Sequence, residues 1–71
     1  MPNISRGRCL LKLRIAEAKT TQAQLSRRTG YAPQQISNWV NNREKMSYEA
    51  AVLCSYVLNC HAEDLYEWHF S

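Results

Sequence analysis

The stretch that decides the fold runs from Thr21 to Trp39 and reads TQAQLSRRTGYAPQQISNW. Thr21, followed three residues later by Gln24, forms a capping box, in which each side chain satisfies a backbone donor at the start of a helix. Gly30 then ends that helix, because glycine adopts the left-handed conformation at little cost. Pro33 suits the first position of the next helix, where the N–H that proline lacks would have no partner. The stretch therefore predicts two short helices joined by a tight turn.

The second of these helices, from residue 33 to about residue 42, has two different faces. Ile36, Trp39 and Val40 recur at the spacing of a single helical face, so they predict a buried stripe. The other face is polar and almost free of charge, and its residues are Gln34, Gln35, Ser37, Asn38, Asn41 and Asn42. This pattern predicts that one side packs against a neighbour while a row of amides and hydroxyls stays accessible.

Apolar spacing in the rest of the chain predicts three further helices and no strands, since no useful length alternates with period two. These helices cover residues 5–18, 47–59 and 62–68, with Ser47 as the cap of the second and Asn59 at its end. All 71 residues then form one domain of the all-α class, a compact bundle of about five short helices. The core is expected to contain Leu25, Ile36, Trp39 and Leu65. The helix over residues 47–59 is expected to supply most of the remaining core, through Ala50, Ala51, Val52, Leu53, Cys54, Tyr56, Val57 and Leu58.

Charge is distributed unevenly along the chain, although the net charge is only +3. All nine basic side chains lie between Arg6 and Lys45 together with two acidic ones, whereas the residues after Lys45 include four acidic side chains and no Lys or Arg. A strongly basic first part attracts polyanions such as nucleic acids. The acidic part of the chain after Lys45 is expected to supply core residues and a contact between two copies of the chain.

Several classes of protein do not fit this composition. The charge-free residues 31–42 contain Pro, Gln, Ser and Asn, and no stretch of the chain approaches the length of apolar residues that a membrane span requires, so we expect none. The first residues include no apolar segment of a secretory signal and the three cysteines do not suit a disulfide framework, which favours a reducing cytoplasm. Cysteines and histidines lack the short paired spacing of zinc ligands, and no catalytic constellation stands out. We therefore expect no metal, no cofactor and no enzymatic activity, with Cys54 in the core and Cys60 in a buried turn.

Residues 21–39 resemble the helix-turn-helix of the lambda-repressor and Cro-like family, also called the xenobiotic-response-element family. The joint spacing of Gln22, Leu25, Gly30, Ile36 and Trp39 carries this resemblance. It continues through the polar loop at 41–45 and through residues 51–65, so it covers most of the chain. The resemblance implies a lambda-repressor-like fold in which residues 21–42 form the helix-turn-helix and the second helix enters the major groove of DNA.

The resemblance also implies two groups of residues that contact DNA. One group lies near the start of the second helix and reads bases, and its members here are Gln34, Gln35, Ser37 and Asn38. Asparagine and glutamine match the donor at N6 and the acceptor at N7 of adenine, so a half-site with A·T pairs is expected. The other group binds phosphate at the start of the first helix and in the loop, and its members are Thr21, Gln22, Asn41, Arg43 and Lys45.

Three positions depart from the family pattern. Ser26 replaces a small alanine, a change that the helix tolerates if the hydroxyl bonds to a helical carbonyl. Ala32 offers no capping oxygen where the family often has serine. Pro33 occupies a position that often contacts DNA, and it has no polar side chain to do so. Base reading is therefore expected to rest on the amides that follow it.

The resemblance implies a transcriptional regulator that binds a double-stranded DNA operator in a sequence-specific manner, a repressor of prophage or mobile-element type. Such a protein is bacterial or phage-encoded, and works in the cytoplasm in association with the nucleoid. An alternative stays open, in which the same fold serves as a protein-interaction module, antirepressor or antitoxin-like, that binds a protein partner. The acidic C-terminal third is consistent with this alternative.

The end of the chain has more aromatic surface than the closing of one core requires. Tyr66, Trp68 and Phe70 form a candidate surface for a homodimer, in which each copy would bind one half of a pseudo-palindromic operator. Packing of the same residues against the helices is an equally good interpretation.

Overall fold

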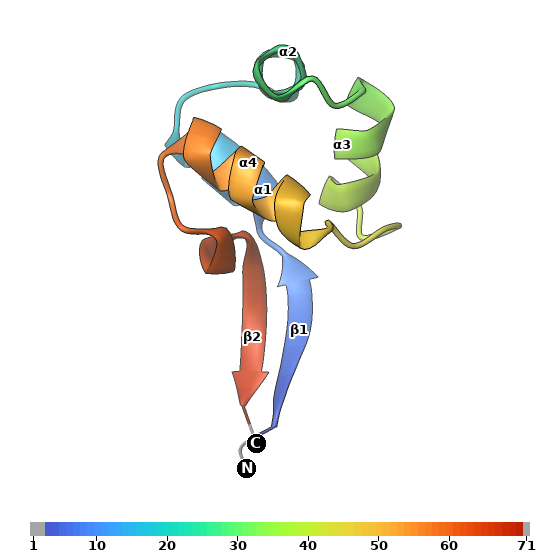
Figure 1. Cartoon of the computed structure of the whole chain (residues 1–71), viewed down its shortest axis with the longest axis vertical. Coiled ribbons are helices and arrows are strands. Elements are labelled where there is room, and N and C mark those ends of the chain that lie inside the picture. The colour runs from blue at the N-terminus through green and yellow to red at the C-terminus, as the bar shows by residue number, and fades with distance from the viewer. Residues whose placement is uncertain (1–2, 71) are drawn as a thin grey trace.

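Four α-helices, one short 3-10 helix and two strands make up residues 3–70, the part of the chain that this computed structural model describes (Figure 1). In chain order the elements are β1 (Ile4–Cys9), α1 (Leu11–Glu17), α2 (Gln22–Thr29), α3 (Pro33–Val40), α4 (Tyr48–Leu58), η1 (Ala62–Leu65) and β2 (Tyr66–Phe70). The helices form one body, and the two strands extend from it as a narrow ribbon along the longest dimension, which measures 40 Å (Figure 1).

Both predicted ends of α2 and the predicted start of α3 are confirmed with one change in detail, whereas α3 ends at Val40, before the predicted end near residue 42. The Oγ1 atom of Thr21 accepts a hydrogen bond from the backbone N–H of Gln24 at 3.2 Å. The return bond of a full capping box is replaced, because the Gln24 side-chain oxygen accepts from the hydroxyl of Thr20 instead. Gly30 ends α2 with φ at +85°, and Pro33 is the first residue of α3. The helix-turn-helix therefore begins and turns where residue types alone predict.

The fourth helix also has the predicted ends. Ser47 Oγ accepts from the backbone N–H of Ala50 at 3.1 Å, which satisfies a donor that the first turn leaves free. Asn59 ends the helix in the left-handed conformation, with φ at +57°. Within residues 3–70, α4 is the longest helix, and none of the helices has the length and apolar character that crossing a bilayer requires.

One cluster of buried side chains joins the elements. Of the expected core residues, those that are buried are Leu25, Ile36, Trp39, Ala50, Cys54, Leu58 and Leu65. Ala51 and Val57 are only half-buried at the edge of this cluster. The predictions for Val52, Leu53 and Tyr56 are wrong, since 41%, 38% and 74% of their surfaces are exposed. The reason lies in the helical period: α4 buries Ala50, Cys54 and Leu58, which recur every four residues, and this places Leu53 outside the buried stripe.

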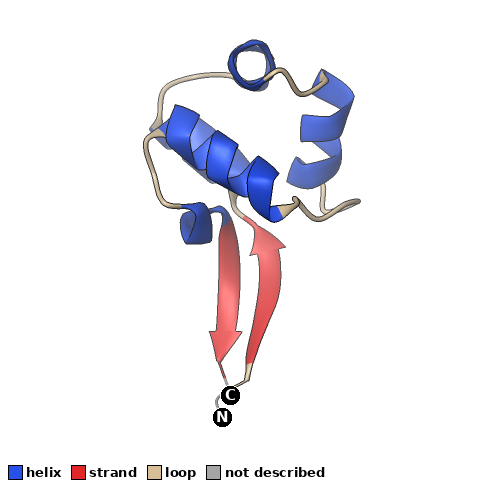
Figure 2. Ribbon diagram, viewed as in Figure 1, coloured by secondary structure: helices blue, strands red, loops and turns tan. Residues whose placement is uncertain are grey.

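The two ends of the chain pair as antiparallel strands, which corrects the all-α prediction (Figure 2). Cα partners are Ile4 with Phe70, Ser5 with His69, Arg6 with Trp68 and Cys9 with Tyr66, and the register is irregular between Arg6 and Cys9. The helix predicted over residues 5–18 is therefore confined to Leu11–Glu17, and the helix predicted over 62–68 is a 3-10 turn followed by a strand.

Both corrections have a physical cause in the residues concerned. The run Tyr66-Glu67-Trp68-His69-Phe70 alternates aromatic residues with polar or charged ones, and aromatic side chains favour a pleated, half-buried surface. Gly7 lies opposite this run. A Cβ atom built on it would lie 3.0 Å from the Cβ of Glu67 and 2.6 Å from the Nε2 of His69. The close approach of the two strands at this point thus depends on glycine.

A Gly7→Ala variant tests this account of the ribbon. We expect a loss of about 1 to 3 kcal/mol in the free energy of unfolding, the usual cost of forcing an extra methyl group into a filled space. Thermal unfolding followed by circular dichroism measures the change, and Ser5→Ala, an exposed substitution in the same strand, is the control. If Gly7→Ala is as stable as Ser5→Ala, the strands do not approach each other as described.

Candidate nucleic-acid interface

Three contacts fix the orientation of α3 against α2. Leu25 of α2 and Ile36 of α3 are both fully buried in the shared core. The Tyr31 ring of the turn packs edge-on against Trp39, with ring centroids 5.0 Å apart. Ser26 donates from its hydroxyl to the carbonyl of Tyr31 at 2.6 Å. The hydroxyl therefore does not bond to a helical carbonyl, the condition under which the helix was expected to tolerate serine here; it ties α2 to the turn instead.

The outward face of α3 is polar along its length. With 100° per residue, burial of Ile36 and Trp39 places Gln34 and Asn38 at the centre of the opposite face and Gln35 and Ser37 at its two edges. Gln34 is exposed, and the other three are half-buried. The four residues predicted to read bases therefore lie on a single surface.

The side chains of this face form a hydrogen-bonded chain. Gln34 Nε2 donates to Asn38 Oδ1 at 3.0 Å, and Asn38 Nδ2 donates to Glu44 Oε1 at 3.0 Å. Gln35 Nε2 donates to the same carboxylate oxygen, also at 3.0 Å. Ser37 belongs to the other edge, where Asn41 Nδ2 donates to both its carbonyl and its Oγ. The three amides thus point along the helix surface in a defined arrangement that ends at Glu44.

Sequence reasoning missed Glu44 as a member of this surface, because residues 41–45 were treated as one polar loop. The loop turns back after α3 at Asn42, where φ is +60°. The backbone N–H groups of Arg43 and Glu44 both donate to the carbonyl of Asn38, at 2.8 and 3.3 Å. The signal available in the sequence was a single acidic residue between Arg43 and Lys45 in an otherwise cationic loop.

The base of the ribbon holds the far end of this loop. Met46 is buried, its backbone N–H donates to the hydroxyl of Tyr66 at 3.0 Å, and its carbonyl accepts from Arg6 Nη1 at 3.0 Å. The guanidinium of Arg6 also lies 4.7 Å from the centre of the Tyr66 ring. At the near end, Cys9 N donates to Asn42 Oδ1 at 3.0 Å. Both strands therefore position the loop that carries Arg43 and Lys45.

The residues predicted to bind phosphate occupy two places on either side of α3. Thr21 and Gln22 lie at the N-terminal end of α2, and Arg43 and Lys45 lie in the loop after α3. In Figure 1, α3 lies between α2 and this loop. Among residues 3–70 the ion pairs are Arg8 with Glu67 and Arg14 with Glu17, so Arg43 and Lys45 have no acidic partner there. Their charge is available to an external anion.

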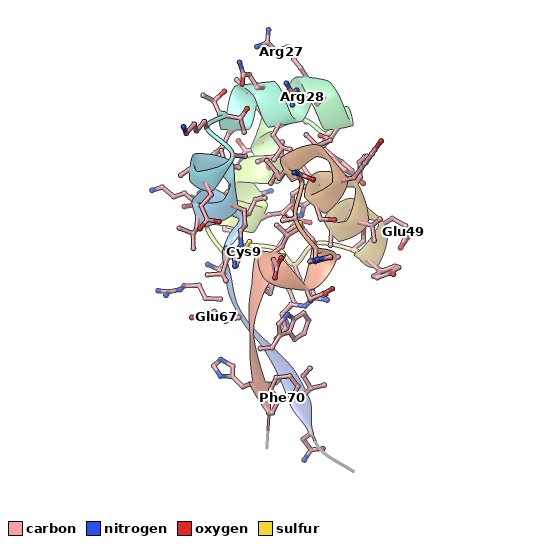
Figure 3. All side chains as sticks on the ribbon, turned by 90° about the vertical axis from the view of Figure 1, so that its left-hand side faces the viewer. Cys9, Arg27, Arg28, Glu49, Glu67 and Phe70 are labelled. Carbon is pink, nitrogen blue, oxygen red and sulfur yellow. The ribbon has the colours of Figure 1, made fainter. Side chains whose placement is uncertain are left out.

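Several other basic residues lie away from this surface or are held by contacts within the fold. Arg27 and Arg28 extend from the end of the molecule opposite the ribbon (Figure 3). Arg14 is held inward: its Nε donates to the carbonyl of Asp64 at 2.8 Å, and its hydrogen bond to Glu17 raises the pKa of its guanidinium. Arg6 is likewise engaged at the base of the ribbon. The basic character of the first part of the chain is thus divided between structural and accessible groups.

The cysteines and histidines are distributed over separate parts of the fold. Cys54 is fully buried in α4, and burial raises the pKa of its thiol to about 11. Cys60 is half-buried after α4, while His69 is exposed on the ribbon. Within residues 3–70, no three side chains of the types His, Cys, Asp and Glu are grouped to hold a metal ion.

Thiol reactivity provides a check on this arrangement. At pH 8 with excess iodoacetamide, we expect Cys60 to react first and Cys54 to react only when the protein unfolds, because a buried thiol of raised pKa is neither accessible nor ionised. Peptide mass spectrometry over time measures both rates. In denaturant the two rates should become similar; equal rates in the native protein would contradict the burial of Cys54.

Comparisons with known proteins agree with this geometry. A family model described as helix-turn-helix matches residues 10–65, which is most of the chain. No curated protein matches the chain significantly in sequence. A solved structure, titled "Crystal structure of a putative DNA-binding protein from Bacteroides fragilis", superposes with a TM-score of 0.78 at 23% identity, covering 92% of this chain and 100% of that one. At this identity the similarity shows a shared fold.

Proposed function

This chain belongs to the Cro/C1-type helix-turn-helix family, and on that premise we propose that it is a transcriptional regulator that binds double-stranded DNA sequence-specifically. The observation that carries the proposal is the amide face of α3. Gln34, Gln35 and Asn38 lie together on the accessible side of a helix whose other side is locked into the core. A helix presented in this way fits the major groove.

The chemistry of the face suits base reading better than phosphate binding. Amides carry no charge, so they gain little from the phosphate backbone, but each one offers a donor and an acceptor to base edges. Affinity comes from the groups on either side, which are the start of α2 with Thr21 and Gln22 and the loop with Asn41, Arg43 and Lys45. Base recognition and phosphate binding are therefore assigned to different residues.

Repression of prophage or mobile-element type is the finer part of the proposal. It rests on the family resemblance, and it needs no more chemistry than DNA binding, because a protein bound at a promoter excludes polymerase by its volume. The setting that follows is the bacterial cytoplasm, with the protein associated with the nucleoid. We assign the chain no enzymatic activity and no cofactor.

The double variant Gln34→Ala with Asn38→Ala tests the reading face. Each good amide-to-base pair is worth about 1 to 3 kcal/mol, so we expect specific retardation of an operator selected from random duplexes to weaken by about 100-fold or more. Gln24→Ala removes an exposed amide from α2 and is the matched control. Circular dichroism must show both variants folded.

The same experiment separates this function from the protein-interaction alternative. Wild-type protein that selects no sequence from a random pool, or a double variant that selects the wild-type sequence with wild-type affinity, would remove the proposal. Binding to the selected duplex should also weaken steeply as salt rises, because counterions are released from the phosphates.

A further part of the proposal concerns self-association. Six large apolar side chains are exposed on the outer side of α4 and at the tip of the ribbon, namely Ile4, Tyr48, Val52, Leu53, Tyr56 and Phe70. The two parts are joined by a hollow to which Tyr48 and Ala51 of α4 and Trp68 of the ribbon contribute. On α4 itself, Tyr48, Val52, Leu53 and Tyr56 line one shallow hollow, and an exposed apolar patch of this kind usually marks a protein contact. Figure 3 shows Phe70 near the tip of the ribbon.

The three residues predicted for this contact differ in how far they are exposed. Tyr66 is buried, and its hydroxyl accepts from the N–H of Met46, so it belongs to the core. Trp68 is half-buried, and its Nε1 donates to the carbonyl of Glu63 at 2.7 Å. Phe70 is 73% exposed. Of the three, Phe70 is the most available for a partner.

A second copy of this chain is the partner that suits the α4 surface. Tyr48 and Tyr56 lie four residues on either side of Val52, and both are about three-quarters exposed, at 75% and 74%. Two antiparallel α4 helices related by a two-fold axis at Val52 would therefore place each Tyr48 against the Tyr56 of the other copy. The same surface patch on both copies is what a symmetric dimer requires.

Sedimentation at increasing concentration tests the dimer. We expect the wild type to associate, free or on DNA, and Tyr56→Glu to stay monomeric, because a charge would be buried within the contact. Leu13→Glu changes another exposed apolar residue, on α1 and outside this surface, and should behave as the wild type. A wild-type protein that is monomeric at every concentration, with and without DNA, would exclude this part of the proposal.

A further inference from the structure

The position of Glu44 is determined by the backbone of its loop rather than by its own side chain. Both its N–H and that of Arg43 donate to the carbonyl of Asn38, so the loop folds against the end of α3. Asn42 is tied to Cys9 at the end of β1, and Met46 is held by Arg6 and Tyr66. Glu44 lies between these two anchors, and its carboxylate is brought to the amide face.

The carboxylate determines which atoms of that face remain available. Its Oε1 accepts one N–H from Gln35 and one from Asn38, while Asn38 Oδ1 accepts from Gln34. Within residues 3–70, the side-chain oxygens of Gln34 and Gln35 and the second carboxylate oxygen of Glu44 have no hydrogen-bond donor. The preassembled surface therefore offers these three acceptors together with the second N–H of each amide.

We propose that Glu44 is a specificity-determining residue of the DNA-reading surface, a role that rests on the function proposed above. Its carboxylate accepts a hydrogen bond from the exocyclic amino group of a base, either N4 of cytosine or N6 of adenine. In the major groove only these two bases present a donor, whereas guanine and thymine present acceptors at the same depth. A carboxylate at this place selects an amino base and excludes the other two.

Glu44 also positions its neighbours. Gln35 and Asn38 each direct one N–H to the carboxylate and Gln34 directs one to Asn38, so the side-chain oxygens of Gln34 and Gln35 stay free to accept from base amino groups. Because each amide also keeps a second N–H, the selection against G and T comes from the carboxylate, which has no donor. Asn38 also links Gln34 to Glu44, and its second N–H and the second lone pair of its Oδ1 stay available to a base.

The charge of Glu44 provides a second reason for this assignment. The carboxylate has no cationic partner in an ion pair within residues 3–70, and in the complex it would face a polyanion. Such a charge weakens binding to every sequence unless a base amino group compensates for it. Glu44 is therefore expected to lower non-specific affinity more than specific affinity, which raises the ratio between the two.

The test compares Glu44→Gln with Glu63→Gln. Both substitutions remove one negative charge from an exposed carboxylate, but Glu63 lies in η1, outside the α3 surface. Each protein selects duplexes from a random pool, and the affinities for the selected and a scrambled duplex are then measured. A third variant, Glu44→Ala, also removes the acceptor that holds Gln35 and Asn38.

For Glu44→Gln we expect one position of the wild-type site to relax from a single amino base to all four bases, with about a 10-fold loss in discrimination there. Affinity for the scrambled duplex should rise several-fold, and Glu63→Gln should leave the discrimination unchanged. Glu44→Ala should relax the adjacent positions as well. Whether the relaxed position was C or A in the wild-type site identifies the amino group that is read.

The outcomes separate the two proposals. A wild-type protein that selects no sequence would overturn the proposed function and, with it, the role of Glu44. A wild-type protein that selects a defined site, together with Glu44→Gln and Glu44→Ala variants that select the same site with the same discrimination, would overturn the role of Glu44 alone. Circular dichroism confirms that each variant is folded.

Discussion

Burial of Ile36 and Trp39 is the constraint on which the rest of the structure depends. A helix of eight residues is too short to be stable alone in water, so α3 exists only because one of its faces packs against α2 and the core. Once that face is buried, the helical period places Gln34 and Asn38 outward. Packing against Tyr31 and the hydroxyl bond from Ser26 then fix the angle at which this surface is presented.

The two-stranded ribbon supports the polar surface of α3 through the loop that follows this helix. Its base is tied to the helical body where Leu10 donates to the carbonyl of Leu65 at 2.8 Å. From there Arg6 and Tyr66 hold Met46, and the N–H of Cys9 holds Asn42. The loop with Arg43, Glu44 and Lys45 is clamped between these points. Residues at both ends of the chain thus position groups next to the central helix, which suggests why a small domain includes a projecting ribbon.

The sequence was most informative where local chemistry decides the outcome. Caps at Thr21 and Ser47, the left-handed turn at Gly30 and the first-turn position of Pro33 all depend on a few neighbouring residues. It was least informative at the ends, where Ile4–Cys9 can form a strand only because Tyr66–Phe70 lies beside it. Pairing between residues some sixty positions apart leaves only a weak local pattern. The alternation over Tyr66–Phe70 was such a pattern, and the helical interpretation of residues 62–68 passed over it.

The sequence by itself determined the two helices of the motif, the turn between them and the amide-rich face of the second, because each follows from residue type and helical period. The tertiary structure decided three further points. It paired the chain ends into a ribbon, placed Tyr66 in the core while Phe70 stayed exposed, and brought Glu44 against Gln35 and Asn38. Each of these depends on where the backbone of a distant segment lies, and residues that are far apart in the chain acquire common chemistry only when the fold brings them together.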